Sequence, residues 1–352
     1  MKHQTTRYGE VPFYKIGTFG NTADAFISKK LFLEYKTKYS FPKKGDILIS
    51  ASGTIGRAVI YDGKPAYFQD SNIVWIDNDE TLVKNDFLFY AYSNVKWNTE
   101  HTTILRLYND NFRNTLIPLP PLNEQIAIAN ILSGLDRYLC ALDALILKKE
   151  SVKKALSFEL LSQRKRLKGF NQAWQRVRFG DIANYLTSNL SAEQIAQQGK
   201  IKVYDVNNFI GYTDTTFISD KPYISIVKDG SVGRVRILPP KTNILSTMGA
   251  LIANHRTTTE FLFYLLSNFD FKNFTSGSII PHIYFKDYKE KTIFLPPLNE
   301  QSAIANILSA LDNEIASLKN KKRQFENIKK ALNHDLMSAK IRVLEKISFI
   351  TK

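Results

Sequence analysis

The sequence carries the heptapeptide Leu-Pro-Pro-Leu-Asn-Glu-Gln twice, at residues 119–125 and 295–301. The second copy begins 176 residues after the first. The identity continues as far as Leu135 and Leu311, and the two stretches differ at 2 of 17 positions. We therefore interpret the chain as a tandem duplication in which each heptapeptide closes one globular unit.

Each heptapeptide opens a long predicted helix. Its two prolines lack amide donors and disfavour helix before them, so they end the preceding element. From Leu122 and Leu298 onward, apolar residues recur at helical spacing between polar ones. Each run covers about 45 residues, or roughly 65 Å of helix at 1.5 Å per residue. A narrow apolar stripe on so long a helix needs a partner helix, so we predict that the two runs pair with each other.

The charge balance indicates a polyanionic partner. Lys and Arg total 48 against 33 for Asp and Glu, which gives a formal net charge of +15. The single cysteine, Cys140, cannot form an internal disulfide. No stretch has the layout of a signal peptide or the length of a transmembrane span, so we expect a soluble cytoplasmic protein.

The expected fold class is α+β, with two mixed α/β domains separated by two long antiparallel coiled-coil helices in a pseudo-two-fold repeat. The first domain covers residues 1–118, and the first long helix lies within residues 119–170. The second domain covers residues 171–294, and the second long helix and a tail cover residues 295–352. In the first domain, alternating apolar stretches predict strands at residues 11–16, 45–50, 57–61 and 73–76. Residues 86–93 predict a short helix capped by Asp86.

The two domains share a frame. Gly-Thr-Ile-Gly-Arg at residues 53–57 matches Gly-Ser-Val-Gly-Arg at residues 230–234. Outside such matched residues the two domain sequences differ widely, as expected for one scaffold that carries two domains with different recognition surfaces. The second domain opens with a lead-in that starts at Trp174 and has no counterpart in the first. Either the chain is a shortened version of a longer form, or another element fills that place.

The sequence shows no catalytic constellation. Five histidines are scattered without metal-ligand spacing, and there is no cysteine pair. No phosphate-binding Gly-x-x-x-x-Gly-Lys-Ser/Thr loop occurs, and the two glycine turns are too short for a nucleotide fingerprint. We therefore expect a chain that is not itself an enzyme, with no catalytic, cofactor-binding or metal-binding residues of its own.

The loops offer side chains that suit DNA instead. Each glycine turn ends in an arginine, Arg57 or Arg234, and arginine can read guanine bidentately. Lysines near the loops suit phosphates, which position a protein on DNA without specifying a sequence. For any single residue, the alternative is a solvated or strand-capping role. The candidate DNA-binding residues are Arg57, Arg234, Ser52, Thr54, Ser231, Lys29, Lys30, Gln69, Asn72, Arg106, Lys221, Arg236, Arg256 and His282.

The layout resembles the specificity (S) subunit of type I restriction-modification systems. The two heptapeptides carry this resemblance, because each opens a long helix after a variable globular unit. The lead-in Trp-Gln-Arg-Val-Arg-Phe-Gly-Asp at residues 174–181 also resembles the family's Trp-x-x-Val-x-Leu-Gly-Asp, with Phe179 at the leucine place. The missing first lead-in is a departure from the family pattern.

The resemblance implies two target-recognition domains that read a bipartite DNA site, one half-site each. It also implies assembly with two methyltransferase (M) subunits and two motor-nuclease (R) subunits. S-adenosylmethionine, ATP and Mg²⁺ would then be used by those partners and not by this chain. A pseudo-two-fold repeat offers equivalent docking surfaces to two identical partners, for which the candidate residues are Phe158, Leu161 and Met337.

Two other hypotheses stay open. One is the recognition part of a single-chain methyltransferase-nuclease, and the other is a coiled-coil adaptor without DNA function. The sequence does not identify the bases recognised, because loop conformation decides which side chains reach base edges.

Overall fold

The computed structural model describes residues 4–68, 72–97 and 106–344. It divides into two compact units, and each takes part of both long helices. Unit 1 comprises Met1–Asp143 and Lys321–Lys352, and unit 2 comprises Ala144–Asn320.

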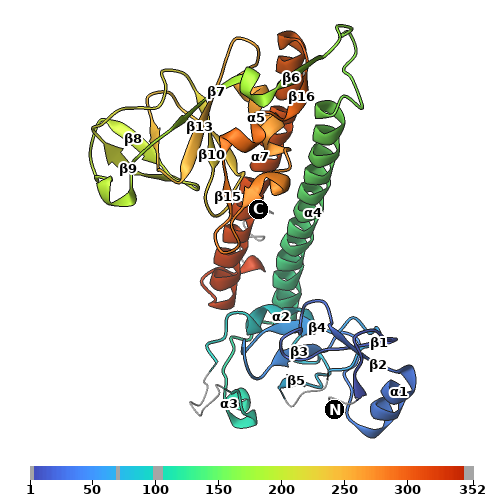
Figure 1. The fold of residues 1–352 in the computed structure, drawn as a ribbon. Helices are drawn as coiled ribbons and strands as arrows, with labels where there is room; N and C mark the ends of the chain where they lie inside the picture. The colour runs from blue at the N-terminus through green and yellow to red at the C-terminus, as the bar shows by residue number, and fades with distance from the viewer. Residues whose placement is uncertain (1–3, 69–71, 98–105, 345–352) are drawn as a thin grey trace. The chain divides into compact units, whose positions relative to one another are not determined.

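The two long helices follow the heptapeptides. α4 (Leu122–Leu161) and α7 (Leu298–Met337) have 40 residues each, which corresponds to about 60 Å (Figure 1). They are shorter than the runs of about 45 residues expected from the apolar pattern. Gln163 and Ala339, two residues beyond the helix ends, both take positive φ angles, of 61° and 55°. A left-handed residue just past a helix end reverses the chain, so the two helices stop at matched places.

Within unit 1, the first half of α4 packs against the second half of α7. Lys329 forms an ion pair with Asp136, and Lys322 forms one with Asp143 at 2.6 Å. Residue numbers rise along α4 as they fall along α7, so the two helices are antiparallel. The aromatic rings of Tyr138 and Phe325 add an apolar contact between these ion pairs.

Unit 2 repeats this arrangement with the other halves of the helices. Lys153 pairs with Asp312, and Lys149 pairs with Glu314 at 2.7 Å. The predicted antiparallel pairing of the helices is therefore confirmed in each unit.

The globular part of unit 1 consists of short strands and helices. In chain order they are β1 (Val11–Phe13), β2 (Ala25–Ile27), α1 (Lys29–Lys38), β3 (Ile47–Ser50), β4 (Ala58–Ile60), β5 (Ile73–Trp75), α2 (Asn85–Tyr92) and α3 (Asn109–Arg113). β1 pairs antiparallel with β2, and α1 packs on the pair. β3 lies between β4 and β5 in a second antiparallel sheet. Ile47 and Ile49 of β3 face α2 and Leu48 faces the other way, toward Phe19, which explains why the whole strand is buried.

The globular part of unit 2 has more strands. In chain order its elements are β6 (Gln175–Arg178), η2 (Phe179–Asp181), β7 (Ala183–Thr187), η3 (Ala192–Gln194), β8 (Ile201–Tyr204), β9 (Phe209–Thr213), β10 (Tyr223–Val227), β11 (Val235–Leu238), β12 (Asn243–Ile244), β13 (Met248–Ala253), α5 (Thr259–Ser267), η4 (Lys272–Phe274), β14 (Thr275–Ser276), β15 (His282–Ile283), α6 (Phe285–Tyr288) and β16 (Thr292–Leu295). The main sheet has the order β11-β10-β13-β7, and β16 pairs antiparallel with β6. β10 is buried at every position, as β3 is in unit 1, and α5 packs on it (Figure 1).

The four strands predicted in the first domain are confirmed as β1, β3, β4 and β5. The predicted helix is confirmed as α2, but the assignment of Asp86 as its cap is wrong. The helix begins one residue earlier, and Lys84 occupies the N-cap position without a side-chain hydrogen bond. The Glu80 carboxylate accepts the Asn85 N–H at 2.8 Å and satisfies a free donor of the first turn.

The glutamine of each heptapeptide ties a long helix to a globular part. In unit 1, the buried Gln125 accepts the Lys84 N–H at 2.8 Å and donates to the Leu82 carbonyl at 3.1 Å. In unit 2, Gln301 accepts the Thr258 N–H at 3.0 Å and donates to the Arg256 carbonyl at 2.9 Å. Each glutamine thus replaces hydrogen bonds to water at the start of the short helix that packs on the sheet.

The glutamate of each heptapeptide is buried and paired. Glu300, with a fully buried side chain, accepts from Arg166 Nη2 at 2.7 Å and from Trp174 Nε1 at 3.0 Å. In unit 1, Arg342 Nη2 donates to Glu124 at 3.2 Å. Both arginines follow the end of one long helix, and both glutamates begin the other. A buried carboxylate needs such partners because burial without them is strongly unfavourable.

A tyrosine from each short helix completes the contact with the long helices. Tyr90 donates to Asp136 at 2.8 Å, and Tyr264 donates to Asp312 at 2.9 Å. Burial, followed by the hydrogen bond to Asp136, raises the pKa of Tyr90. Burial and Asp312 raise the pKa of Tyr264 in the same way. Both hydroxyls therefore stay protonated as donors to carboxylates that also hold lysines from the partner helix.

We expect the substitution Glu300→Ala to lower the free energy of unfolding of the chain by about 2–4 kcal/mol, because Trp174 and Arg166 lose a buried acceptor. The matched control is Glu314→Ala, which removes a partly exposed ion pair and should cost less than about 1 kcal/mol. Urea unfolding followed by circular dichroism measures both values. Equal losses for the two variants would contradict the assigned role of Glu300.

Candidate nucleic-acid interface

A glycine turn joins two neighbouring strands at the same place in each unit. It connects β3 to β4 in unit 1 and β10 to β11 in unit 2. Gly56 and Gly233 take φ angles of +84° and +80° there. A Cβ on Gly56 would lie 2.2 Å from Trp97 Nε1, and one on Gly233 would lie 2.6 Å from Phe271 Cδ2. Each turn therefore rests on an aromatic ring that requires glycine above it.

In unit 1 the turn lies beside three predicted residues. Ser52 pairs with Arg106 in an isolated β-bridge, and the Leu107 N–H donates to the Ala51 carbonyl at 2.8 Å. Arg106 Nη2 donates to Asn72 Oδ1 at 3.2 Å. The structure thus brings Ser52, Asn72 and Arg106 together.

In unit 2 the corresponding bridge joins Asp229 and His282. Nδ1 of His282 lies 2.7 Å from Asp229 Oδ1, and the Gly230 N–H donates to the Pro281 carbonyl at 2.9 Å. His282 therefore holds the place that Arg106 holds in unit 1. Ser231 is exposed on the same glycine turn, two residues after Asp229.

The two turn arginines differ in their contacts. Arg57 Nη1 donates to the carbonyl of Phe19 at 2.9 Å, so its side chain is tied to a neighbouring loop. Arg234 is exposed, and its side chain makes no hydrogen bond or ion pair to another described residue. The Arg234 guanidinium keeps all its donors for a ligand, whereas Arg57 has already committed one.

The remaining predicted residues lie at several places. Arg236 Nη1 donates to the Asn207 carbonyl at 2.9 Å, and its guanidinium lies 5.3 Å from the centre of the Tyr204 ring. Lys29 and Lys30 are exposed at the start of α1, Lys221 is exposed before β10, and Thr54 is exposed on the turn. Gln69 lies outside the described residues. None of these positions decides between a base contact and a phosphate contact, so the roles stay predictions.

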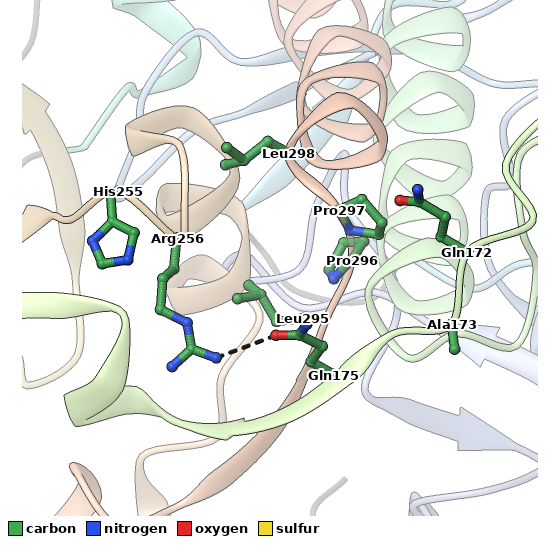
Figure 2. Close-up of a pocket in the computed structure, with 9 residues that line it drawn as sticks. All are labelled: Gln172, Ala173, Gln175, His255, Arg256, Leu295, Pro296, Pro297 and Leu298. Atoms are coloured by element: carbon green, nitrogen blue, oxygen red, sulfur yellow. Dashed lines mark hydrogen bonds between the residues drawn. The ribbon is translucent and has the colours of Figure 1, made fainter.

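Arg256 lies in different surroundings. Figure 2 shows its side chain directed toward Gln175, and Nη2 of Arg256 donates to Oε1 of that residue at 3.3 Å. Both residues line a cavity of about 430 Å³ together with Pro296 and Pro297 of the heptapeptide. The structure thus places Arg256 beside the lead-in of unit 2, and not among the residues around the glycine turn at residues 230–234.

The three predicted docking residues are also unlike one another. Phe158 is 53% exposed, with the Arg164 guanidinium 4.5 Å from its ring centre. Leu161 is partly buried against the core of unit 2. Met337 is 5% exposed and belongs to the core of unit 1. Its burial argues against a docking role for Met337, whereas the role of Phe158 stays a prediction.

Sequence reasoning missed the partners that position the arginines. Phe19 and Asn207 act through backbone carbonyls, which any residue type supplies, so composition gives no signal for them. It also missed the rings of Trp97 and Phe271 under the turns. The repeated Gly-x-x-Gly-Arg pattern was an indirect signal, because a left-handed glycine commonly marks close packing.

No group of three or more His, Cys, Asp or Glu side chains within residues 4–68, 72–97 and 106–344 is arranged to hold a metal ion. Among the helices of these residues, none is both long and apolar enough to cross a membrane.

Comparison with known families identifies the chain. The family model of the type I restriction modification DNA specificity domain matches residues 1–150 and 171–327. The chain belongs to this family. The two matched stretches contain the two glycine turns, so each turn lies in one copy of the family's domain.

Curated relatives carry the same description. A putative type I restriction enzyme specificity subunit from Haemophilus influenzae is 64% identical over 137 residues, which are 39% of this chain and 36% of that protein. The match therefore spans about a third of that relative's length. A putative type I specificity subunit from Methanocaldococcus jannaschii is 29% identical over 335 residues, or 85% of this chain and 79% of that protein.

Solved structures share the fold. The crystal structure of a type I restriction-modification system S subunit from M. genitalium has a TM-score of 0.63 at 20% identity and covers 96% of this chain and 91% of that one. A chain from a study of complex assembly and conformational transition of a type I system has a TM-score of 0.54 at 16% identity and covers 84% of this chain and 82% of its own length. The expected fold class of two α/β domains with long helices is thereby confirmed.

We expect Arg234→Ala to weaken binding of DNA that contains the half-site of unit 2 by about 1–3 kcal/mol, because a free guanidinium can donate two hydrogen bonds to a guanine edge. Arg57→Ala should affect only the half-site of unit 1 and should also lower stability by about 0.5–1.5 kcal/mol, since the hydrogen bond to Phe19 is lost. Binding titrations with DNA mutated in either half-site measure the effect.

The matched control is Arg176→Ala, which removes the same charge from an exposed position on β6. If Arg234→Ala and Arg176→Ala weaken all DNA sequences equally, Arg234 contacts phosphate and the assignment to a base is wrong.

Proposed function

We propose that this chain is the DNA sequence-specificity subunit of a type I restriction-modification complex. In this role, the globular part of each unit reads one half of a bipartite DNA site. The observation that carries the proposal is that each unit has a glycine turn, at residues 53–57 or 230–234, bridged to a second segment at the same place. The backbone turn and its bridge recur in both units, whereas the side chains at the bridge differ.

The differences between the clusters suit two different half-sites. Unit 1 presents Arg106 with Asn72, a cation and an amide that suit guanine and adenine edges. Unit 2 presents His282 with Asp229 at the same bridge, and Arg234 is exposed at the end of the same glycine turn. Two identical clusters would favour a palindromic site, so these residues favour a site with unlike halves.

The charge of the chain supports DNA as the ligand. The formal net charge of +15 attracts a polyanion, and the exposed lysines at the start of α1 suit phosphate oxygens. In the proposed complex, two M subunits dock on equivalent faces of the repeat, and two R subunits join for cleavage. The partners use S-adenosylmethionine, ATP and Mg²⁺, and this chain supplies recognition without catalysis.

Sequencing of methylated DNA from cells that express this chain with its M partner tests the proposal. We expect one bipartite methylated motif that is absent when this chain is omitted. Methylation that is unchanged without the chain would contradict its role in specificity.

We expect the affinity of the chain for duplex DNA to fall steeply with salt, because each neutralised phosphate adds about 0.9 to the slope of log affinity against log salt concentration. Fluorescence anisotropy between low and physiological salt measures the slope. Negligible binding that does not respond to salt would instead support an adaptor without DNA function.

We expect a four-residue helical insertion after Asp143 in α4, combined with one after Asn320 in α7, to lengthen the unread spacer of the site by about one or two base pairs. Both insertions fall between unit 1 and unit 2, so contacts within each unit are kept. Each adds about 6 Å of helix, and DNA rises about 3.4 Å per base pair.

The methylated motif of the double-insertion variant, compared with that of the unaltered chain, is the measurement. The half-site sequences should stay the same. A single insertion after Asp143 is the control, because it lengthens one helix only and should disrupt the antiparallel pairing. An unchanged spacer in an active double-insertion variant would show that helix length does not set the spacing.

A further inference from the structure

The side chains of Asp229 and His282 meet because of the register of their backbones. The Gly230 N–H and the Ile283 N–H each donate a hydrogen bond of 2.9 Å across the bridge, one on either side of the pair. Asp229 and His282 therefore form a non-hydrogen-bonded pair, in which two antiparallel backbones come closest. Side chains directly opposite each other in such a pair point to the same face, so the carboxylate and the imidazole come into contact.

The hydrogen bond between these side chains decides which imidazole nitrogen carries a proton. Nδ1 of His282 lies 2.7 Å from Oδ1 of Asp229. An ionised carboxylate can only accept hydrogen bonds, so Nδ1 is the donor. In a neutral imidazole, the other nitrogen is then an acceptor. Nε2 of His282 makes no hydrogen bond to another residue that the structure describes, so this acceptor is available to a ligand.

The imidazole of His282 is held in place on its other sides as well. On the side away from the bridge, His282 pairs with Ser276 of β14. A Cβ on Gly277, which has a φ of +91°, would lie 3.0 Å from Cδ2 of His282, so the ring packs closely there. The ring of Tyr284 lies nearly parallel to the imidazole, with 6.4 Å between the ring centres. The His282 side chain is nevertheless 36% exposed, which leaves part of the fixed ring open to a ligand.

The matched position of unit 1 has the opposite hydrogen-bonding character. Arg106 stands there, opposite Ser52 at the place of Asp229, and its Nη2 donates to Asn72. An arginine side chain has donors only, whereas Nε2 of His282 is an acceptor. The two units therefore offer donors in one case and an acceptor in the other at the same place in their frame.

We propose that Nε2 of His282 accepts a hydrogen bond from the exocyclic amino group of an adenine or a cytosine, and that Asp229 is the positioning residue that keeps Nε2 unprotonated. In the major groove, adenine and cytosine present amino donors, whereas guanine and thymine present carbonyl acceptors at the corresponding places. An imidazole whose Nδ1 is held as the donor therefore distinguishes amino bases from carbonyl bases. This inference rests on the proposed recognition function and deepens it by naming the chemical group that unit 2 reads.

Nitrogen NMR of the full chain with isotope-labelled histidine tests the tautomer without DNA, at about pH 8, above the range in which histidine usually gains its charge. We expect a protonated Nδ1 and an unprotonated Nε2 for His282, whose signals are those lost in His282→Gln. Asp229→Asn should move both signals toward averaged values, because an amide donates or accepts and thus permits both tautomers. Asp220→Asn removes the same charge from an exposed position of unit 2 and should leave the signals unchanged.

Base analogues test the amino group. In the half-site of unit 2, each adenine is replaced in turn by purine and each cytosine by pyrimidinone, bases that lack only the exocyclic amino group. At one position we expect the full chain to bind about three- to tenfold more weakly, because one hydrogen bond is lost. Fluorescence anisotropy measures the affinity, and the position that responds shows whether the amino group belongs to adenine or to cytosine.

The variant His282→Ala completes a double-mutant cycle with these analogues. Removal of the amino group should change its affinity by less than about twofold, since the acceptor is already gone. Asp229→Asn should show a smaller loss than the unaltered chain, and Asp220→Asn should show the full loss. Retained discrimination at the half-site of unit 1 shows that each variant is folded.

Three results would overturn the inference. They are a protonated Nε2 in the unaltered chain, an equal loss for the unaltered chain and His282→Ala at every position, and the absence of any loss in a chain that binds its site. Absence of sequence-specific DNA binding by the unaltered chain would overturn the proposed function itself, and the base contact with it. The NMR measurement decides the role of Asp229 in either case.

Discussion

A buried carboxylate at the start of each long helix holds an arginine that follows the end of the other. Glu300 holds Arg166, and Glu124 holds Arg342. Because of this exchange, neither half of the duplicated sequence makes a unit by itself. Unit 2 needs the end of α4 and unit 1 needs the end of α7, so the antiparallel helix pair is part of both cores. The position of the short helices, the sheets behind them and the glycine turns all follow from this frame.

Much of this frame could be predicted from the sequence, since a 17-residue near-identity and a long apolar periodicity are strong local signals. The crossed pairing was harder, because Arg166 meets Glu300 across 134 residues and no spacing rule links them. The β1–β2 pair with α1 was only partly predicted, because β2 offers just three residues of alternation. At the candidate site, arginine types were found, but the backbone carbonyls that orient Arg57 and Arg236 were not.

In the two glycine turns, one set of residues fixes the backbone path and another set supplies the side chains available to a ligand. The glycine, the ring beneath it and the bridge to a second segment recur in both units, and they fix where the backbone runs. The side chains at the bridge do not recur, since Ser52 and Arg106 in one unit correspond to Asp229 and His282 in the other. A surface of this kind can change its ligand preference by substitution at the few positions that form the bridge. The aromatic packing that shapes the loop is left intact by such changes.

The contacts of the heptapeptide glutamines bear on how globular parts can be exchanged between related genes. Gln125 and Gln301 hold the globular parts through main-chain atoms, at Lys84 and Leu82 in one unit and at Thr258 and Arg256 in the other. A main-chain contact is indifferent to the side chain attached to it. A globular part with an unrelated surface therefore seats on the same helices if its backbone follows the same path. Genetic recombination within the near-identical stretches can then transfer an entire globular part between genes without loss of a single glutamine contact.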